Sequence, residues 1–192
     1  MVKVLGLVGS PRDGNTKFLV SLALQECEKL GMETELVHIG RMKIAPCNDC
    51  ERCRKEGRCV INDDFQHAAD KLEKADGVII GSPVYFGCIS AQLKAFMDRT
   101  RYLRRGEKLV DKVGGAIAIG GSRQGGQELV LRQIHNFFLI HGMVVVGDEK
   151  TRHFGGAGFG NAKDAAQNDE EGKETSRNLG RHVGQVVLKM KK

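Results

Sequence analysis

Aromatic side chains are scarce in this 192-residue chain, which has no tryptophan, two tyrosines and an aromatic content of 5%. Long apolar segments are also missing, since no run approaches the roughly 18 apolar residues that a membrane-spanning helix needs. The apolar start, residues 1–8, is too short for the apolar region of a signal peptide with its cleavage site. We therefore expect a protein that stays in the cytoplasm and has no membrane partner.

Several common functional motifs are absent as well. The six histidines form no set with metal-ligand spacing, and no arrangement of serine, histidine and aspartate indicates a hydrolase. The net charge of +6 is modest, and no basic motif interleaved with aromatic residues supports binding to nucleic acid. Cysteine, in contrast, is concentrated in one place: four of the six cysteines lie between Cys47 and Cys59.

The apolar pattern alternates between short buried strands and amphipathic helices. It predicts strands at residues 3–8, 34–39, 77–81, 115–119 and 143–146, and helices at residues 16–30, 64–74, 91–102, 127–141 and 170–191. Such alternation produces right-handed crossovers and a parallel sheet between two helical layers. We expect a single α/β domain over residues 1–192, in which residues 148–192 form a C-terminal loop and helix. The glycine-rich residues 155–160 are expected to be a loop without regular structure.

The loop after the first strand, residues 9–16, leads directly into a helix. Small and hydroxyl residues at a helix N-terminus present free backbone N–H groups and the positive end of the helix dipole. Ser10, Asn15 and Thr16 add side-chain donors, and Arg12 adds a positive charge. The loop lacks the Gly-Lys-Ser/Thr ending of a Walker loop and the Gly-x-Gly-x-x-Gly pattern of dinucleotide sites. We interpret it as a phosphate cradle, with a capped helix after a tight turn as the alternative.

Two further loops follow the third and fourth strands. In residues 81–87, Pro83 fixes the backbone direction and is followed by Val84, Tyr85 and Phe86. In residues 120–127, four glycines within seven positions let the backbone approach a ligand closely. Ligands of such sheets bind outside the carboxyl ends of the strands, so we expect the three loops to converge on one crevice. A strand end that buries both aromatic rings is the alternative for residues 81–87.

Four segments carry a family resemblance: residues 10–16, residues 82–87 (Ser-Pro-Val-Tyr-Phe-Gly), residues 94–99 (Lys-Ala-Phe-Met-Asp-Arg) and residues 120–127. Through them the chain resembles the NADPH-dependent FMN reductase family over roughly residues 1–147. The resemblance implies a flavodoxin-like fold with a five-stranded parallel sheet in the order 2-1-3-4-5, and an FMN site built from the three loops. The residues it implies are Ser10, Arg12, Asn15 and Thr16 for the phosphate and, around the flavin, Pro83, Val84, Tyr85, Phe86, Gly87, Gly121, Ser122 and Gly126.

The spacing Cys47-x2-Cys50-x2-Cys53-x5-Cys59 is the most specific pattern in the chain. Cytosolic thiols are kept reduced, so clustered cysteines favour metal ligation over disulfides. Three thiolates at intervals of three residues can wrap around three iron corners of a [4Fe–4S] cube, whereas structural zinc prefers two separated cysteine pairs. We predict that residues 45–62 form an iron–sulfur loop with these four cysteines as ligands. Zinc, or free and redox-regulatory thiols, are the alternatives.

This insert makes the chain resemble the iron–sulfur flavoprotein branch of the family. The resemblance implies homodimers or homotetramers in which the cluster of one subunit lies near the flavin of another. The scarcity of aromatic rings agrees, because the chain is poorly equipped to cover both faces of a flavin by itself. The other two cysteines, Cys27 and Cys88, are expected to pack among apolar residues.

A cluster beside a flavin indicates a redox enzyme that converts single electrons into pairs. We expect a ferredoxin-like donor, transfer through the cluster to FMN, and a small acceptor such as oxygen, peroxide, a quinone or another carrier. The basic residues 99–105 are a candidate docking surface for an acidic carrier, although solvated helix ends explain them more simply. The alternatives are an NAD(P)H-dependent FMN or quinone reductase, a zinc-stabilised flavin-binding regulatory module without turnover, and an electron shuttle like flavodoxin. No acid–base catalytic residue is predicted.

Overall fold

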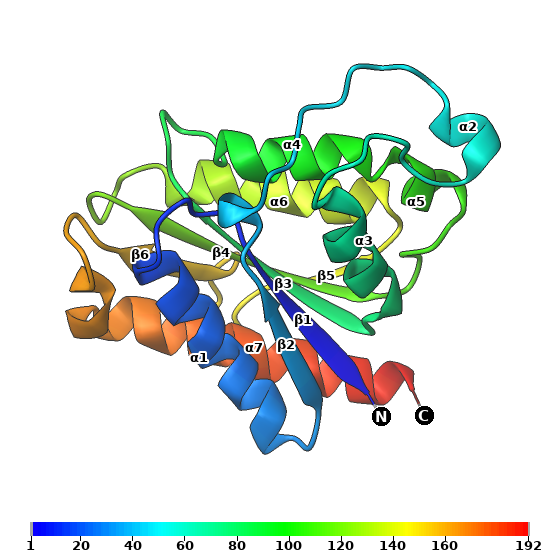
Figure 1. Cartoon of the computed structure of the whole chain (residues 1–192). Helices are drawn as coiled ribbons and strands as arrows, with labels where there is room; N and C mark the ends of the chain where they lie inside the picture. The colour runs from blue at the N-terminus through cyan, green and yellow to red at the C-terminus, as the bar shows by residue number, and fades with distance from the viewer. Residues whose placement is uncertain (1, 192) are drawn as a thin grey trace.

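The computed structural model describes residues 2–191 and shows a parallel sheet between two layers of helices (Figure 1). In chain order the elements are β1 (Lys3–Val8), α1 (Asn15–Lys29), β2 (Glu33–Val37), the short 3-10 turn η1 (Ile39–Arg41), α2 (Cys53–Glu56), α3 (Phe65–Lys74), β3 (Gly77–Pro83), α4 (Ala91–Arg99), α5 (Arg101–Arg105), β4 (Val113–Gly120), α6 (Gln127–Ile140), β5 (Val144–Val146), β6 (Gly156–Phe159), the 3-10 turn η2 (Ala165–Asn168) and α7 (Glu170–Met190).

The five main strands are arranged in the order β2-β1-β3-β4-β5, and all neighbouring pairs are parallel. In the register of the central strands, Val4 lies opposite Gly77 and Gly77 lies opposite Val113. The predicted strand order and the flavodoxin-like α/β class are therefore confirmed.

The glycine-rich segment forms a sixth strand, so the prediction of an irregular loop at residues 155–160 was wrong. Strand β5 pairs with β4 only at residues 113–115, which leaves the rest of that edge of β4 without a partner. Strand β6 takes this place in parallel, with Ile117 opposite Gly156 and Gly120 opposite Phe159. The pairing satisfies backbone groups that would otherwise be buried without hydrogen bonds. Its glycines leave room for α1, since a Cβ atom at Gly158 would lie 2.3 Å from Leu19 Cδ1.

Two separate cores cover the two faces of the sheet, because successive side chains of a strand point to opposite faces. Leu5 and Ile80 belong to the core formed with α3, α4 and α6. Val4 and Ile79 belong to the core formed with α1 and α7. Figure 1 shows the same division, with α1 and α7 on one side of the sheet and α3, α4 and α6 on the other.

The cysteine loop lies between η1 and α3, after β2 as predicted, and contains the single turn of α2. Figure 1 shows this loop projecting beyond the sheet to the region of α5. The predicted helix over residues 91–102 is interrupted at Thr100, so that α4 and α5 are separate elements. Within residues 2–191, none of the helices combines the length and apolar character that crossing a membrane requires.

Candidate functional site

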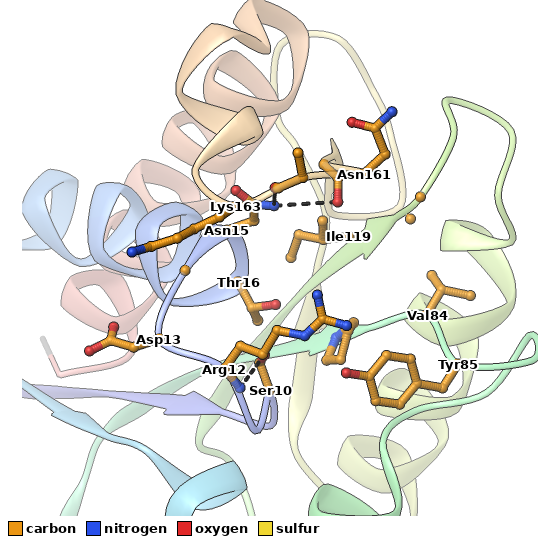
Figure 2. Close-up of a pocket in the computed structure, with 16 residues that line it drawn as sticks. Ser10, Arg12, Asp13, Asn15, Thr16, Val84, Tyr85, Ile119, Asn161 and Lys163 are labelled. Carbon is orange, nitrogen blue, oxygen red and sulfur yellow. Dashed lines mark hydrogen bonds between the residues drawn. The ribbon is translucent and has the colours of Figure 1, made fainter.

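The loops after β1, β3 and β4 line one pocket of about 390 Å³ (Figure 2). The expected convergence of the three loops is therefore observed. Eight of the twelve residues assigned to the flavin by resemblance line this pocket: Ser10, Arg12, Asn15, Thr16, Pro83, Val84, Tyr85 and Gly121. The pocket has a fourth wall that the sequence did not suggest, formed by residues 160–163 after β6.

The N-terminus of α1 opens on this pocket. Helix α1 begins at Asn15, its N-cap Gly14 supplies no side-chain cap, and its first turn carries no acidic residue. The backbone N–H groups of the first turn are consequently available to an anion, and the helix dipole favours negative charge there. Arg12 on the first loop and Lys163 on the fourth wall add positive charge around the same pocket. The site is therefore suited to a phosphate group.

Asn15 has a different environment from the one expected of a free phosphate ligand. Its carboxamide nitrogen donates to the carbonyl oxygens of Gly160, at 3.3 Å, and Ala162, at 2.8 Å. Its carboxamide oxygen accepts a hydrogen bond from the backbone N–H of Ala166 at 3.1 Å. The side chain thus holds the fourth wall against α1. The partners lie more than 140 residues away along the chain, so no local pattern could have indicated this contact.

The second loop ends in a tight hairpin turn. The backbone N–H groups of Tyr85 and Cys88 each donate to the carbonyl oxygen of the other at 3.0 Å. Between them, Phe86 and Gly87 adopt left-handed conformations with φ of 51° and 74°. Phe86 is fully exposed and Tyr85 partly so, which rules out the alternative in which the strand end buries both rings. Cys88 is exposed too, contrary to the expected packing, because the turn projects away from the sheet.

Ser90 connects the first two loops by hydrogen bonds. Its hydroxyl donates to the carbonyl oxygen of Gly9 at 2.6 Å, and its backbone N–H donates to the hydroxyl of Ser82 at 3.1 Å. The same hydroxyl accepts from the N–H of Leu93 at 3.2 Å, which caps α4. A serine just before a helix indicates a cap, but no sequence pattern links Ser90 to the loop after β1.

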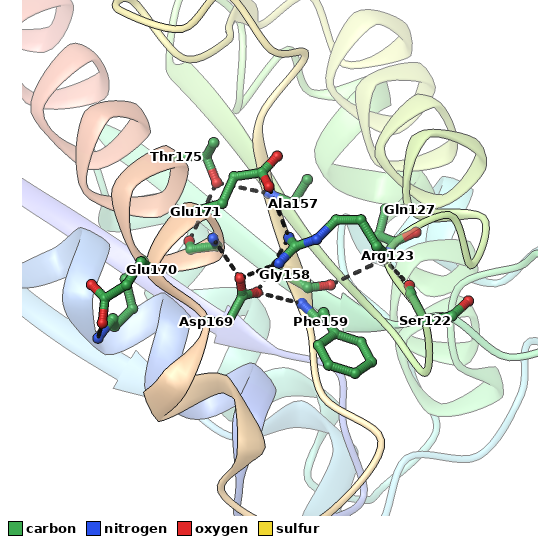
Figure 3. Close-up of polar contacts among 12 residues, drawn as sticks. Ser122, Arg123, Gln127, Ala157, Gly158, Phe159, Asp169, Glu170, Glu171 and Thr175 are labelled. Carbon is green, nitrogen blue, oxygen red and sulfur yellow. Dashed lines mark hydrogen bonds and ion pairs between the residues drawn. The ribbon is translucent and has the colours of Figure 1, made fainter.

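Side chains of the third loop and of the start of α6 bind the C-terminal segment through polar contacts (Figure 3). The Gln127 amide donates to the carbonyl oxygens of Ser122, at 2.7 Å, and Gly158, at 3.1 Å. Arg123 forms an ion pair with the buried Asp169, the N-cap of α7. Asp169 also accepts from the N–H groups of Phe159, at 2.6 Å, and Gly172, at 3.1 Å. Burial acts to raise the pKa of Asp169, but these donors and the Arg123 charge outweigh it, and the pKa is lowered.

Four residues of the flavin assignment lie outside the pocket lining: Phe86, Gly87, Ser122 and Gly126. Gly126 packs against the second loop, since a Cβ atom there would lie 3.4 Å from Val84 Cγ1. It also has φ of 91°, a conformation that favours glycine, immediately before α6. The backbone turn and the packing of the two loops therefore explain why residue 126 is a glycine.

The four clustered cysteines line a second, smaller pocket, separate from the first. Its other lining residues include Arg99, Arg101 and the apolar side chains of Val60 and Ile61. Cys47 and Cys50 are exposed, whereas Cys53 and Cys59 are half-buried and pack against the α3, α4 and α6 core. The sequence prediction that these four thiols share one location is consistent with this geometry.

The backbone of the cysteine loop is strained. Asp49 and Glu51 have φ of 52° and 54°, a left-handed conformation that costs free energy for residues other than glycine. The Arg101 guanidinium forms ion pairs with both side chains, at 2.7 Å to Asp49 and 3.3 Å to Glu51. Strained residues held in this way are frequent at ligand-binding loops.

Four thiols around one pocket match the ligand set of a [4Fe–4S] cube. Charged residues of both signs complete the lining: Arg99, Arg101, Asp49, Glu51 and Asp98. A single structural zinc ion requires four ligands at about 2.3 Å from one point. Within residues 2–191, no three or more His, Cys, Asp or Glu side chains are arranged to hold one metal ion. The donor set therefore fits a [4Fe–4S] cube by ligand type, and four thiols are equally the donor type of a structural zinc ion.

The basic stretch at residues 99–105 is only partly a surface. Arg99, Tyr102 and Leu103 are buried, while Arg104 and Arg105 are exposed. The expectation that the whole stretch forms solvated helix ends or a docking patch is wrong for Arg99, because its side chain is enclosed between α4 and the ends of the cysteine loop.

Comparison with known proteins agrees with this geometry. The family model described as NADPH-dependent FMN reductase matches residues 2–155. An iron–sulfur flavoprotein of Methanocaldococcus jannaschii is 52% identical over 193 residues, covering 100% of both chains. An iron–sulfur flavoprotein of Methanosarcina thermophila is 42% identical over 180 residues, covering 93% of each chain.

Solved structures support the fold. The flavodoxin, WrbA-like protein of Agrobacterium tumefaciens superposes with a TM-score of 0.71 at 21% identity, covering 98% of this chain and 99% of that one. From the family match and the full-length identity, the chain belongs to the iron–sulfur flavoprotein branch of the NADPH-dependent FMN reductase family and is an FMN-dependent oxidoreductase.

Proposed function

We propose that the protein passes single electrons from a reduced carrier such as a ferredoxin through a [4Fe–4S] cluster to FMN and on to a small acceptor. The acceptor is oxygen, peroxide, a quinone or another carrier. When bound, the cluster supplies one-electron transfer and FMN supplies one- or two-electron transfer. In this proposal residues 1–192 act as one domain, and residues 45–62 hold the cluster.

The observation that carries the proposal is the presence of Cys47, Cys50, Cys53 and Cys59 around one pocket, together with a separate pocket suited to a phosphate. A chain that only bound FMN would not need four thiols at one place on a strained loop. The two half-buried cysteines pack on the same core as α4 and α6, so the loop is anchored to the rest of the fold.

The residues of the larger pocket would bind and orient FMN. The free N–H groups of α1, with Arg12 and Thr16, would hold the phosphate. Val84 and Tyr85 line the side of the pocket that leads toward the exposed Phe86, where an isoalloxazine ring would lie. Asn15 contributes by positioning the wall of residues 160–163.

A basic surface beside the cysteine loop supports docking of an acidic carrier. Arg104 and Arg105 on α5 are exposed, and α2 within the loop packs near α5. The loop itself exposes Lys55 and Arg58, whereas its Arg52 and Arg54 are paired with Glu56 and Glu51. Complementary charge speeds the encounter of redox partners and is screened by salt. Electron delivery should therefore slow as the ionic strength rises.

Exposed apolar side chains on the Phe86 turn and along α6 support self-association as a homodimer or homotetramer. Phe86 is fully exposed, and Leu129, Leu139 and Ile140 on α6 are each about 60% exposed. Leu129 adjoins the Phe86 turn, because a Cβ atom at Gly87 would lie 3.5 Å from its Cδ1. A second copy of the chain would cover these side chains and supply the flavin cover that this chain lacks. Light scattering of the purified protein measures the assembly.

The second candidate function is an NAD(P)H-dependent FMN or quinone reductase in which the cluster is an accessory. It is favoured by the family model, whose description names NADPH. The two functions differ in the electron donor. Under anaerobic conditions, rapid bleaching of the flavin by NAD(P)H alone supports the reductase, and bleaching only by a reduced ferredoxin supports the proposed route.

The experiment that tests the proposal is an absorption spectrum of protein purified without oxygen, with iron, sulfide, zinc and FMN measured on the same sample. We expect flavin bands on a broad brown absorbance, with about four irons and one FMN per chain. Zinc without sulfide would contradict the proposal and leave a simple FMN reductase or a zinc-stabilised regulatory module.

Two variants make this experiment specific for the cysteine pocket. Cys53→Ala removes a half-buried thiol of the pocket and should abolish most of the bound iron while FMN stays bound. Cys88→Ala removes an exposed thiol that does not line that pocket and should leave both iron and FMN unchanged. Equal loss of iron in both variants would show that the pocket is not the binding site.

A further inference from the structure

Arg99 joins the two ends of the cysteine loop from inside the protein. It is the last residue of α4, and its side chain is completely buried. Its Nη1 donates to the carbonyl oxygen of Ala45 at 3.0 Å, and its Nη2 donates to that of Ile61 at 3.1 Å. These two carbonyl groups lie just before and just after the four cysteines. The guanidinium group therefore closes the base of the loop.

Asp63 is the counter-charge of Arg99 and is itself fully engaged. Its Oδ2 lies 2.6 Å from Arg99 Nη1, and it accepts hydrogen bonds from the N–H groups of Ala45, at 2.9 Å, and Phe65, at 3.0 Å. The Phe65 ring covers the guanidinium, with its centroid 4.3 Å from Cζ. The position of Arg99 is thus fixed from several sides.

One donor of this guanidinium remains without a partner. Nε of Arg99 is buried, and none of the described residues accepts a hydrogen bond from it. Buried N–H groups without an acceptor are rare and unfavourable, so this group is expected to have a ligand. Arg99 lines the cysteine pocket. Burial acts to lower the pKa of Arg99, but Asp63 and then the nearby Cys59 sulfur outweigh it, and the pKa is raised.

We propose that the Nε–H group of Arg99 donates a hydrogen bond to the Cys59 sulfur of the bound cluster, and that Arg99 thereby raises the reduction potential of the cluster. This inference rests on the proposed function. Reduction adds one electron from the carrier, which is oxidised, and Arg99 keeps its proton throughout. The added negative charge would be shared by the sulfur atoms, so a fixed N–H donor aimed at one of them would stabilise the reduced state more than the oxidised state.

Arg101 offers a matched comparison. It lines the same pocket, but about a third of its side chain is exposed and it is paired with the exposed Asp49 and Glu51. Arg101 is in contact with water, and no buried donor of its guanidinium is left without an acceptor among the described residues. A change at Arg101 should therefore have a smaller effect on the potential than the same change at Arg99.

The test compares the wild-type protein, Arg99→Lys and Arg101→Lys, each purified without oxygen. Lysine keeps one positive charge but cannot bind Asp63 and both carbonyl groups while also donating to Cys59. The cluster potential is measured by redox titration followed by electron paramagnetic resonance, with iron, sulfide and FMN quantified. We expect Arg99→Lys to shift the one-electron equilibrium at least tenfold toward the oxidised cluster, which is about 59 mV, and Arg101→Lys to shift it less.

The outcomes separate the two proposals. A loaded Arg99→Lys protein with the wild-type potential would overturn the role of Arg99 and reduce it to a structural clamp. Wild-type protein without iron and sulfide would instead refute the proposed function.

A second measurement on the wild-type protein covers the case in which Arg99→Lys fails to retain a cluster. Arginine labelled with nitrogen-15 at Nε should give a resolved hyperfine coupling in pulsed resonance spectra of the reduced cluster. Labelled Arg101→Lys should keep this coupling. Absence of the coupling in the wild-type protein would overturn the proposal.

Discussion

The carboxamide nitrogen of Asn15 lies 2.8 Å from the carbonyl oxygen of Ala162, 147 residues further along the chain. This hydrogen bond connects the first turn of α1 to the segment after β6. Both lie beside the phosphate cradle, so one side chain links the N-terminal and C-terminal parts of the pocket. We therefore expect Asn15 to contribute to the stability of the protein without FMN, and Arg12 of the same loop to contribute to its affinity for FMN.

Replacing Asn15 by alanine should destabilise the protein before any ligand is added. The substitution removes three hydrogen bonds to backbone groups of residues 160–166, and we expect the free energy of unfolding to fall by about 1–2 kcal/mol. Urea denaturation without added FMN measures this change.

Arg12→Ala is the matched control for Asn15→Ala. Arg12 is exposed on the same loop, so its removal should change the free energy of unfolding by less than about 0.5 kcal/mol. It should instead weaken FMN relative to riboflavin, by about tenfold, because only FMN has a phosphate. If Asn15→Ala proves as stable as Arg12→Ala, the carboxamide has no structural role.

Phe86→Ala should weaken FMN binding while leaving the stability of the protein unchanged. The ring is fully exposed, so we expect the free energy of unfolding to change by less than about 0.5 kcal/mol. A contact between the ring and the flavin is worth about 1 kcal/mol, which corresponds to roughly fivefold weaker FMN binding in the variant. Fluorescence titration with FMN measures the affinity. Phe154→Ala, at another exposed phenylalanine outside the pocket, should bind FMN as the wild type does.

Asp169 should make the free energy of unfolding fall as the pH is lowered below about 4. Its folded pKa lies below the unfolded value of 3.8, so its contribution is fully present above about pH 4 and is lost as the pH falls through the folded pKa. Asp169→Asn should lower the free energy of unfolding at pH 7 by about 1–3 kcal/mol. The difference in free energy of unfolding between the variant and the wild type should become smaller below pH 4. Urea denaturation between pH 7 and pH 3 measures the gap.

The control for this pH dependence is Glu170→Gln, one residue further along. The Glu170 side chain is largely exposed, so the variant should follow the wild type across the whole pH range. A gap for Asp169→Asn that stays constant from pH 7 to pH 3 would contradict the assigned role of the carboxylate.

Cys27 and Cys88 should differ sharply in reactivity. Burial raises the pKa of the Cys27 thiol to about 12, and the thiol donates to the carbonyl oxygen of Gly180 at 3.2 Å. Cys88 is exposed on the hairpin turn. At pH 8, iodoacetamide should modify Cys88 in the native protein and Cys27 only after denaturation, as read by peptide mass spectrometry. Modification of both at equal rates would show that α1 opens readily.

The sequence by itself determined the layer architecture and the location of the chemistry. Val4 and Leu5 are neighbours on one strand and pack in opposite cores, because successive side chains of a strand point to opposite faces of the sheet. The spacing from Cys47 to Cys59 placed four thiols within one loop, and they line one pocket. Both features are local, because a strand period or a cysteine interval is read within a few residues.

Only the tertiary structure decided the contacts that satisfy distant backbone and charged groups. Strand β6 forms because β5 leaves part of the β4 edge unpaired. Arg99 belongs to the interior because the two ends of the cysteine loop present carbonyl groups to it, although Arg104 and Arg105 of the same basic stretch are exposed. A buried donor takes whichever acceptor the completed fold brings within reach, and that choice is made by packing between segments far apart in the chain.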